Sequence, residues 1–115
     1  GQNSNIRELI QRDDQDLVNK SIAAAEVYAK KNYTETDEVF LSVNVFAHAF
    51  YMAQKKSIEC GPQKREWLKR ESEFALDFYF EKKYKGVALP DNHKSVIVCS
   101  FLRGFYVGYP ITDEN

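Results

Sequence analysis

Three side chains that could take part in chemistry lie in the segment VFLSVNVFAHAFYMAQ, four and three residues apart. They are Asn44, His48 and Tyr51. On a helix this spacing places them on one face. An imidazole that titrates near neutral pH, beside an amide and a phenol, can orient a ligand or move a proton. A lone histidine on an otherwise apolar helix is also a common packing residue. The face is therefore a candidate small pocket, with a packing role as the alternative.

Other motifs with known chemistry are absent from the sequence: there is no P-loop, no GxSxG and no GxGxxG that opens a helix after a strand. His48 and His93 are the only histidines, and neither has cysteines or carboxylates at zinc-site spacing. We predict no metal site and no cofactor, and we favour a non-enzymatic role over an enzyme. A charged stripe at helical spacing should be solvated, because aromatic residues occupy the opposite side; it comprises Glu66, Arg70, Glu73, Asp77 and Glu81.

A basic corner lies between residues 55 and 70, which include six basic and two acidic residues, a local charge of +4. A helix, a turn with glycine and a second helix that begins with proline loosely resemble a helix-turn-helix, and basic residues near a helix start can meet phosphate. Solubilising surface lysines are the alternative interpretation. The nucleic-acid candidates are Lys55, Lys56, Lys64, Arg65, Trp67 and Lys69.

The stretch CSFLRGFYVGYP carries a third candidate site. If it is helical, Ser100, Gly104 and Gly108 lie four residues apart and let another backbone approach closely. Phe101, Phe105 and Tyr109 form an aromatic row beside them. The neighbour can be another helix of the same chain or a partner, including a second copy, and the sequence leaves these two open.

Composition limits the function classes. The chain has 115 residues, enough for one domain with a core of its own, and eight Phe, seven Tyr and one Trp supply core material. A formal charge of −1 gives no global attraction to nucleic acid or to an anionic membrane, and no apolar run is long enough to span a bilayer. Two cysteines, Cys60 and Cys99, are too few for a disulfide framework, although a single bridge stays open. We expect a cytoplasmic protein, while Gly1 as a tag remnant leaves a removed leader open.

Helical periodicity and end signals predict the elements. Asn5 and Glu8 resemble a capping box for a helix to about residue 31, which an acidic run near Asp13 or Asp14 could divide in two. Thr34 or Thr36 should cap a second helix to about residue 59, apolar nearly all round and therefore central.

Glycine and proline then divide the second half of the chain. Gly61 should end the second helix and Pro62 should begin the third at a tight antiparallel corner. Gly86 should end the third helix near residue 85, and Asp91 or Asn92 should cap a fourth from 93 to 107. The third helix has one arc that contains Trp67, Glu71, Phe74 and Phe78, with Leu68, Ala75 and Tyr79 beside it.

These elements predict one all-α domain over residues 1–115, an irregular bundle of four to five helices with residues 110–115 as a flexible tail. The β-branched run Val96-Ile97-Val98 favours a strand, so the alternative is an α+β fold with a hairpin at about 95–109. The functional expectation is an interaction or regulatory module that associates with itself or a protein partner through its last helix. Nucleic-acid binding at the basic corner and a ligand pocket around His48 are the alternatives.

Overall fold

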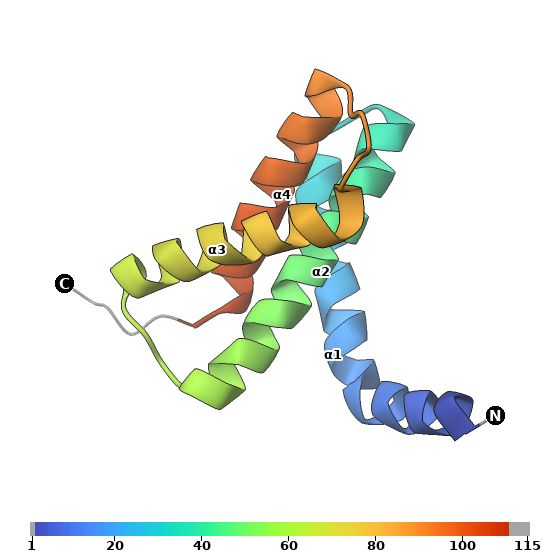
Figure 1. Ribbon diagram of the computed structural model, residues 1–115, viewed down its shortest axis with the longest axis vertical. Helices are drawn as coiled ribbons and strands as arrows, with labels where there is room; N and C mark the ends of the chain where they lie inside the picture. The colour runs from blue at the N-terminus through green and yellow to red at the C-terminus, as the bar shows by residue number, and fades with distance from the viewer. Residues whose placement is uncertain (1, 111–115) are drawn as a thin grey trace.

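Four α-helices build the chain in the computed structural model, which describes residues 2–110, with side chains from residue 14 onward. They are α1 (Gln2–Asn32), α2 (Thr36–Cys60), α3 (Arg65–Tyr84) and α4 (Asp91–Gly108), and the described residues contain no strand (Figure 1). The predicted all-α class with four helices is confirmed. The alternative hairpin at 95–109 is excluded, since nearly all of that stretch lies within α4.

The sequence left open whether the first helix is divided in two. It is a single helix, because α1 runs without a break from Gln2 to Asn32. Asp14 does not cap a second segment; its carboxylate bonds to side chains of α2 instead. The side chains of the predicted capping box, Asn5 and Glu8, lie outside the described residues. The same is true of Gly1 and of residues 111–115 in the predicted tail.

The second helix is central, as its composition predicted, because α2 packs against both α1 and α4. Small side chains face it from α1, where Ser21, Ala25 and Ala29 are almost completely buried. Phe46 and Phe50 of α2 fill the space that these small residues leave. Apolar residues on two opposite sides of α2 are therefore both needed for packing.

The closest helix contact joins α2 to α4 through glycines. A Cβ placed on Gly104 would lie 2.5 Å from the backbone oxygen of Phe46, and one on Gly108 would lie 2.7 Å from that of Phe50. At the far end of the same contact the buried hydroxyls of Ser42 and Ser100 share a hydrogen bond of 2.8 Å. The helices approach closely because side chains are nearly absent from the seam.

The β-branched run in α4 supplies part of the core. Val96 is 2% exposed and Ile97 is fully buried, and Phe101 follows one turn later in the same cluster. Burial of these side chains outweighs the modest helix penalty of branching at Cβ.

The third helix departs from the predicted antiparallel corner. In the described fold the backbone of α3 lies close to that of α4 but not to that of α2. Figure 1 shows α3 running at an angle to α2, and the two helices meet through side chains such as His48 and Tyr79. Gly61 does end α2, with a φ of +74° that favours glycine, and its N–H donates to the oxygen of Ser57. Pro62 does not begin α3, because the chain continues to an extended Lys64 before the helix starts at Arg65. Residues 61–64 therefore form the connection between the two helices.

Aromatic residues hold the connection between α2 and α3. The hydroxyl of Tyr109, just after α4, donates to the oxygen of Gly61, and the Trp67 ring lies 5.3 Å from the Tyr109 ring, centroid to centroid. Tyr109 is 1% exposed. The end of α4 thus fixes the place where α3 diverges.

The predicted side-chain caps did not form. Glu35 precedes α2 and Pro90 precedes α4, neither with a side-chain cap bond, so the predictions for Thr34, Thr36 and Asp91 were wrong. Asn92 lies inside the first turn of α4 and donates to Glu38 of α2 at 2.8 Å. Its amide ties two helices together rather than capping one.

Candidate functional site: an apolar groove between α2 and α3

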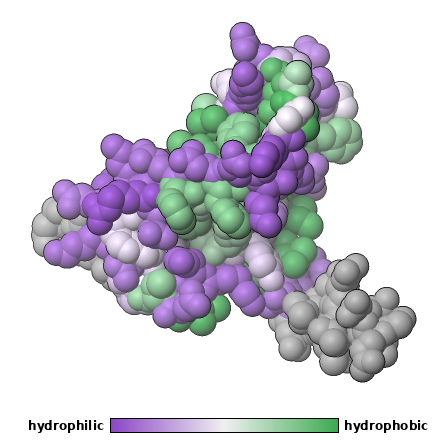
Figure 2. Space-filling model, viewed as in Figure 1, coloured by the Kyte–Doolittle hydropathy of each residue, from purple (hydrophilic) through white to green (hydrophobic). Residues whose placement is uncertain are grey.

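A groove opens along the described surface where α2 and α3 diverge. Two neighbouring hollows, of about 450 and 260 Å³, share Met52 and Phe78 in their walls and form one depression. Phe105 of α4 contributes to the lining, since α4 packs against both helices behind it. Figure 2 shows apolar side chains gathered between α3 and α2, below the band of hydrophilic side chains along α3.

The groove exposes two large aromatic residues. Phe74 is 72% exposed and Phe78 is 55% exposed, although α3 buries Leu68, Leu76 and Tyr79 on its other side. The arc that the sequence placed on one side of this helix is therefore exposed at Phe74 and Phe78. Leu68 and Tyr79, which the sequence placed beside that arc, form the packing face.

Lysines surround this apolar surface. Lys82 and Lys83 line one end of the groove, and Lys56 lies on the α2 wall. The Lys82 ammonium lies 5.6 Å from the centroid of the Phe78 ring, and Lys56 makes a long ion pair of 3.9 Å with Glu71. The rim is thus mostly basic around an apolar floor.

The predicted charged stripe, which is mostly acidic, runs along the outer side of α3, next to Phe74. Its five residues, Glu66, Arg70, Glu73, Asp77 and Glu81, are all exposed, as the sequence predicted. The exposed rings of Phe74 and Phe78 therefore form an apolar ridge on α3. Acidic residues lie on one side of this ridge, and the groove with its basic rim lies on the other.

His48 lies at the end of the groove next to Tyr79. Their ring centroids are 5.0 Å apart. Partial removal from water lowers the pKa of His48, and the positive charge of Lys83 lowers it further. The imidazole is exposed, and none of the hydrogen bonds described for residues 14–110 involves it.

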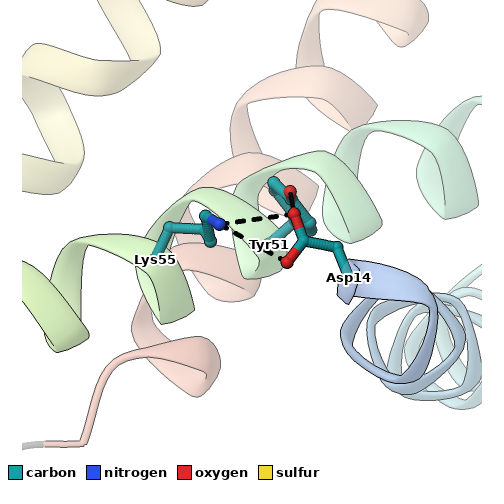
Figure 3. Close-up of polar contacts among 3 residues, drawn as sticks. All are labelled: Asp14, Tyr51 and Lys55. Carbon is teal, nitrogen blue, oxygen red and sulfur yellow. Dashed lines mark hydrogen bonds and ion pairs between the residues drawn. The ribbon is translucent and has the colours of Figure 1, made fainter. Parts of the chain in front are cut away.

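The three residues of the candidate small pocket do line one depression. Asn44, His48 and Tyr51 share a shallow hollow of about 340 Å³ with apolar residues of α1. The Tyr51 hydroxyl, however, donates to Asp14, and Lys55 reaches the same carboxylate at 3.3 Å (Figure 3). The phenol therefore connects α1 to α2, and the pocket hypothesis stays a prediction.

The Asp14 contacts shift two pKa values. The hydrogen bond from Tyr51 lowers the pKa of Asp14 most. Burial opposes this effect, and the hydrogen bond and positive charge of Lys55 lower the pKa further. The same hydrogen bond to a carboxylate raises the pKa of Tyr51. Sequence reasoning missed Asp14 as a partner for this face, because no local pattern relates residues 37 positions apart.

The basic corner is only partly available. Lys55 pairs with Asp14 and Lys56 with Glu71, and the Trp67 ring packs on Tyr109. Lys64, Arg65 and Lys69 are exposed at the start of α3. Nucleic-acid binding here stays a prediction, and it requires affinity that falls steeply with salt and is lost in Lys64→Glu with Arg65→Glu.

The candidate interface on the last helix faces the interior of the chain. All six of its residues are buried, and α2 occupies the seam of the glycines; they are Ser100, Phe101, Gly104, Phe105, Gly108 and Tyr109. The sequence left open whether these glycines contact another helix of the same chain or a partner. In the structure they contact α2 of the same chain.

Other site classes receive no support from the described residues. Among residues 14–110 no three potential metal ligands among His, Cys, Asp and Glu lie together. Cys60 and Cys99 are both exposed and not bonded to each other. The helices described for this chain include none that is long and apolar enough to cross a membrane.

Comparisons of the chain with protein-family models, curated proteins and solved structures found no match. The groove and its rim are therefore the basis for the functional argument. A signal for it was present in the sequence, since α3 has more large apolar residues than one buried face can hold. Phe74 and Phe78 lie on a different side of the helix from Leu68 and Leu76.

Proposed function

We propose that this chain is a non-enzymatic protein-interaction module that binds its partner in the groove between α2 and α3. The supporting observation is the pair of exposed rings, Phe74 and Phe78, beside an apolar depression. Contiguous apolar surface of this kind commonly marks a protein contact, because water contact with such rings is unfavourable.

The shape of the groove favours a helical or extended segment as the binding partner. The depression follows two diverging helices, so an amphipathic helix can lay its apolar side between them. Lysines at the rim would then contact polar or acidic residues flanking that apolar side.

A photo-crosslinking pair tests the proposal. Benzoylphenylalanine replaces Phe74 in one sample and Phe40 in another, since Phe40 is 67% exposed but lines none of the described hollows. In the cells that make the protein, irradiation should give discrete protein adducts from position 74 and few from position 40. Equal yields at both positions, or no adduct at position 74, would contradict the proposal.

A further inference from the structure

We infer that the partner in the α2–α3 groove is a second copy of this chain. The inference rests on the proposed function, and it adds the identity of the partner. Two features of the surface carry it: a ridge lies next to the groove, and opposite charges lie on either side of that ridge.

The ridge and the groove are parts of one continuous surface. Phe74 and Phe78 project from α3, and the depression beside them is lined by Met52, Phe78 and Phe105. In a two-fold dimer the same surface of both copies meets, so each ridge can enter the groove of the other copy. In each copy, α3 therefore supplies the ridge that enters the other copy and one wall of the groove that receives the other copy's ridge.

The charges match the same arrangement. Glu73, Asp77 and Glu81 are exposed along the outer side of the ridge, while Lys56 and Lys82 lie at the groove rim. When the ridge of one copy enters the groove of the other, its acidic side meets a basic rim. Complementary charges at the edge of an apolar contact give specificity and favour the two-fold arrangement over random association.

The exposed rings give such a dimer its driving force. Phe74 and Phe78 are each more than half exposed in the single chain. A dimer removes four such rings from water, two from each copy, and aromatic residues at the centre of an interface contribute most of the binding free energy.

Charge reversal provides a test with a built-in control. The rim variant is Lys56→Glu with Lys82→Glu, and the stripe variant is Glu73→Lys with Asp77→Lys. Each variant alone places like charges at both rim contacts of a two-fold dimer. An equimolar mixture of the two restores opposite charges at both contacts.

Sedimentation velocity over a concentration series gives the readout. We expect the unchanged chain to dimerise, and each variant alone to dissociate with a dissociation constant raised at least about tenfold. The mixture should recover the dimer. All four substituted positions are at the surface, and the one ion pair among them is long, so circular dichroism should confirm that both variants fold.

Substitution of the rings separates this interface from any other. Phe74→Ser should abolish the dimer and Phe40→Ser should leave it intact. A dimer that loses stability equally in both, or one that neither charge variant weakens, lies on another surface and overturns the inference.

The two proposals fail in different ways. If the unchanged chain is a monomer at every concentration while position 74 crosslinks a different protein, the second-copy inference is wrong and the groove is still an interaction site. If the chain is a monomer and position 74 crosslinks nothing, both proposals are wrong.

Discussion

Single atoms decide how closely α2 and α4 can pack. The glycine seam works because backbone oxygens of α2 occupy the space where side chains of α4 would be. The same glycines that suggested an external partner are therefore required by the chain's own core. Their replacement should first affect stability.

Replacing Gly104 tests this at the residue scale. In Gly104→Ala the new methyl group would meet the Phe46 oxygen at 2.5 Å, so the helices must separate. We expect a loss of about 1–3 kcal/mol in the free energy of unfolding, typical of an overpacked core. Urea denaturation measures it. Arg103→Ala, at the exposed neighbouring position, is the control and should change stability by less than about 0.5 kcal/mol; similar losses in both would contradict the argument.

Asp14 gives a second residue-scale prediction, in its pH dependence. Its pKa is lowered in the folded chain from 3.8, so the carboxylate adds stability that is complete above pH 3.8 and is lost as the pH falls through the folded pKa. In Tyr51→Phe the largest cause of the shift is removed, and the pKa of Asp14 should rise. Carboxyl chemical shifts followed by NMR titration measure it.

The control for that titration is Tyr33→Phe, because Tyr33 makes no contact with Asp14 among the described hydrogen bonds. It should leave the Asp14 titration unchanged. A titration of Asp14 that is the same in Tyr51→Phe as in the unchanged chain would show that the hydrogen bond does not determine the pKa.

At the scale of elements, local signals predicted where most helices stop but not how they are arranged. Gly61 and Gly86 both have a φ of +74°, and each follows within two residues of a helix end, as their positions in the sequence predicted. Such signals are local, since they depend on the conformation of one residue. The number and class of elements could be predicted for the same reason.

The inward face of α3 could not be predicted, because two of its sides have apolar residues at helical spacing. Which side turns inward depends on α4, whose Phe101 and Ile97 meet Leu68, Leu76 and Tyr79 in one cluster. That choice is made by tertiary contacts between distant segments. The groove was not predicted from the sequence, because it is lined by the side of α3 that stays exposed after the other side has packed against α4.

The connection between α2 and α3 gives an element-scale prediction. Tyr109→Phe removes the hydrogen bond to Gly61 that joins the end of α4 to this turn. We expect faster amide hydrogen exchange over residues 61–67 and a stability loss of about 0.5–1.5 kcal/mol. Tyr106→Phe, on the half-exposed side of α4, should show neither effect. Unchanged exchange at residues 61–67 in Tyr109→Phe would mean that the bond does not hold the turn.

At the scale of the whole molecule, the core connects segments that are far apart in the chain, with no covalent bond between them. Cys60 ends α2 and Cys99 lies on the outer side of α4, and both are exposed. The fold therefore depends on noncovalent contacts, which are apolar packing and the hydrogen bonds and ion pairs between helices.

Thiol chemistry tests this last point. Both cysteines should react with a disulfide reagent in the native protein, giving the same two thiols as the denatured chain, and a reducing agent should leave the melting temperature unchanged. Absorbance of the released thiolate counts them. A native chain with no reactive thiol, or a lower melting temperature on reduction, would show that the two are bridged.

The Ser42–Ser100 contact has a consequence for the time course of synthesis. The two residues are 58 positions apart. At a synthesis rate of 5–20 residues per second, Ser42 leaves the ribosome about 3–12 s before its partner. For those seconds α4 is not yet present to cover the apolar side of α2 against which it packs in the folded chain. Slower translation of the α3 segment would lengthen this exposure, so codon choice there should influence how much of the newly made chain aggregates.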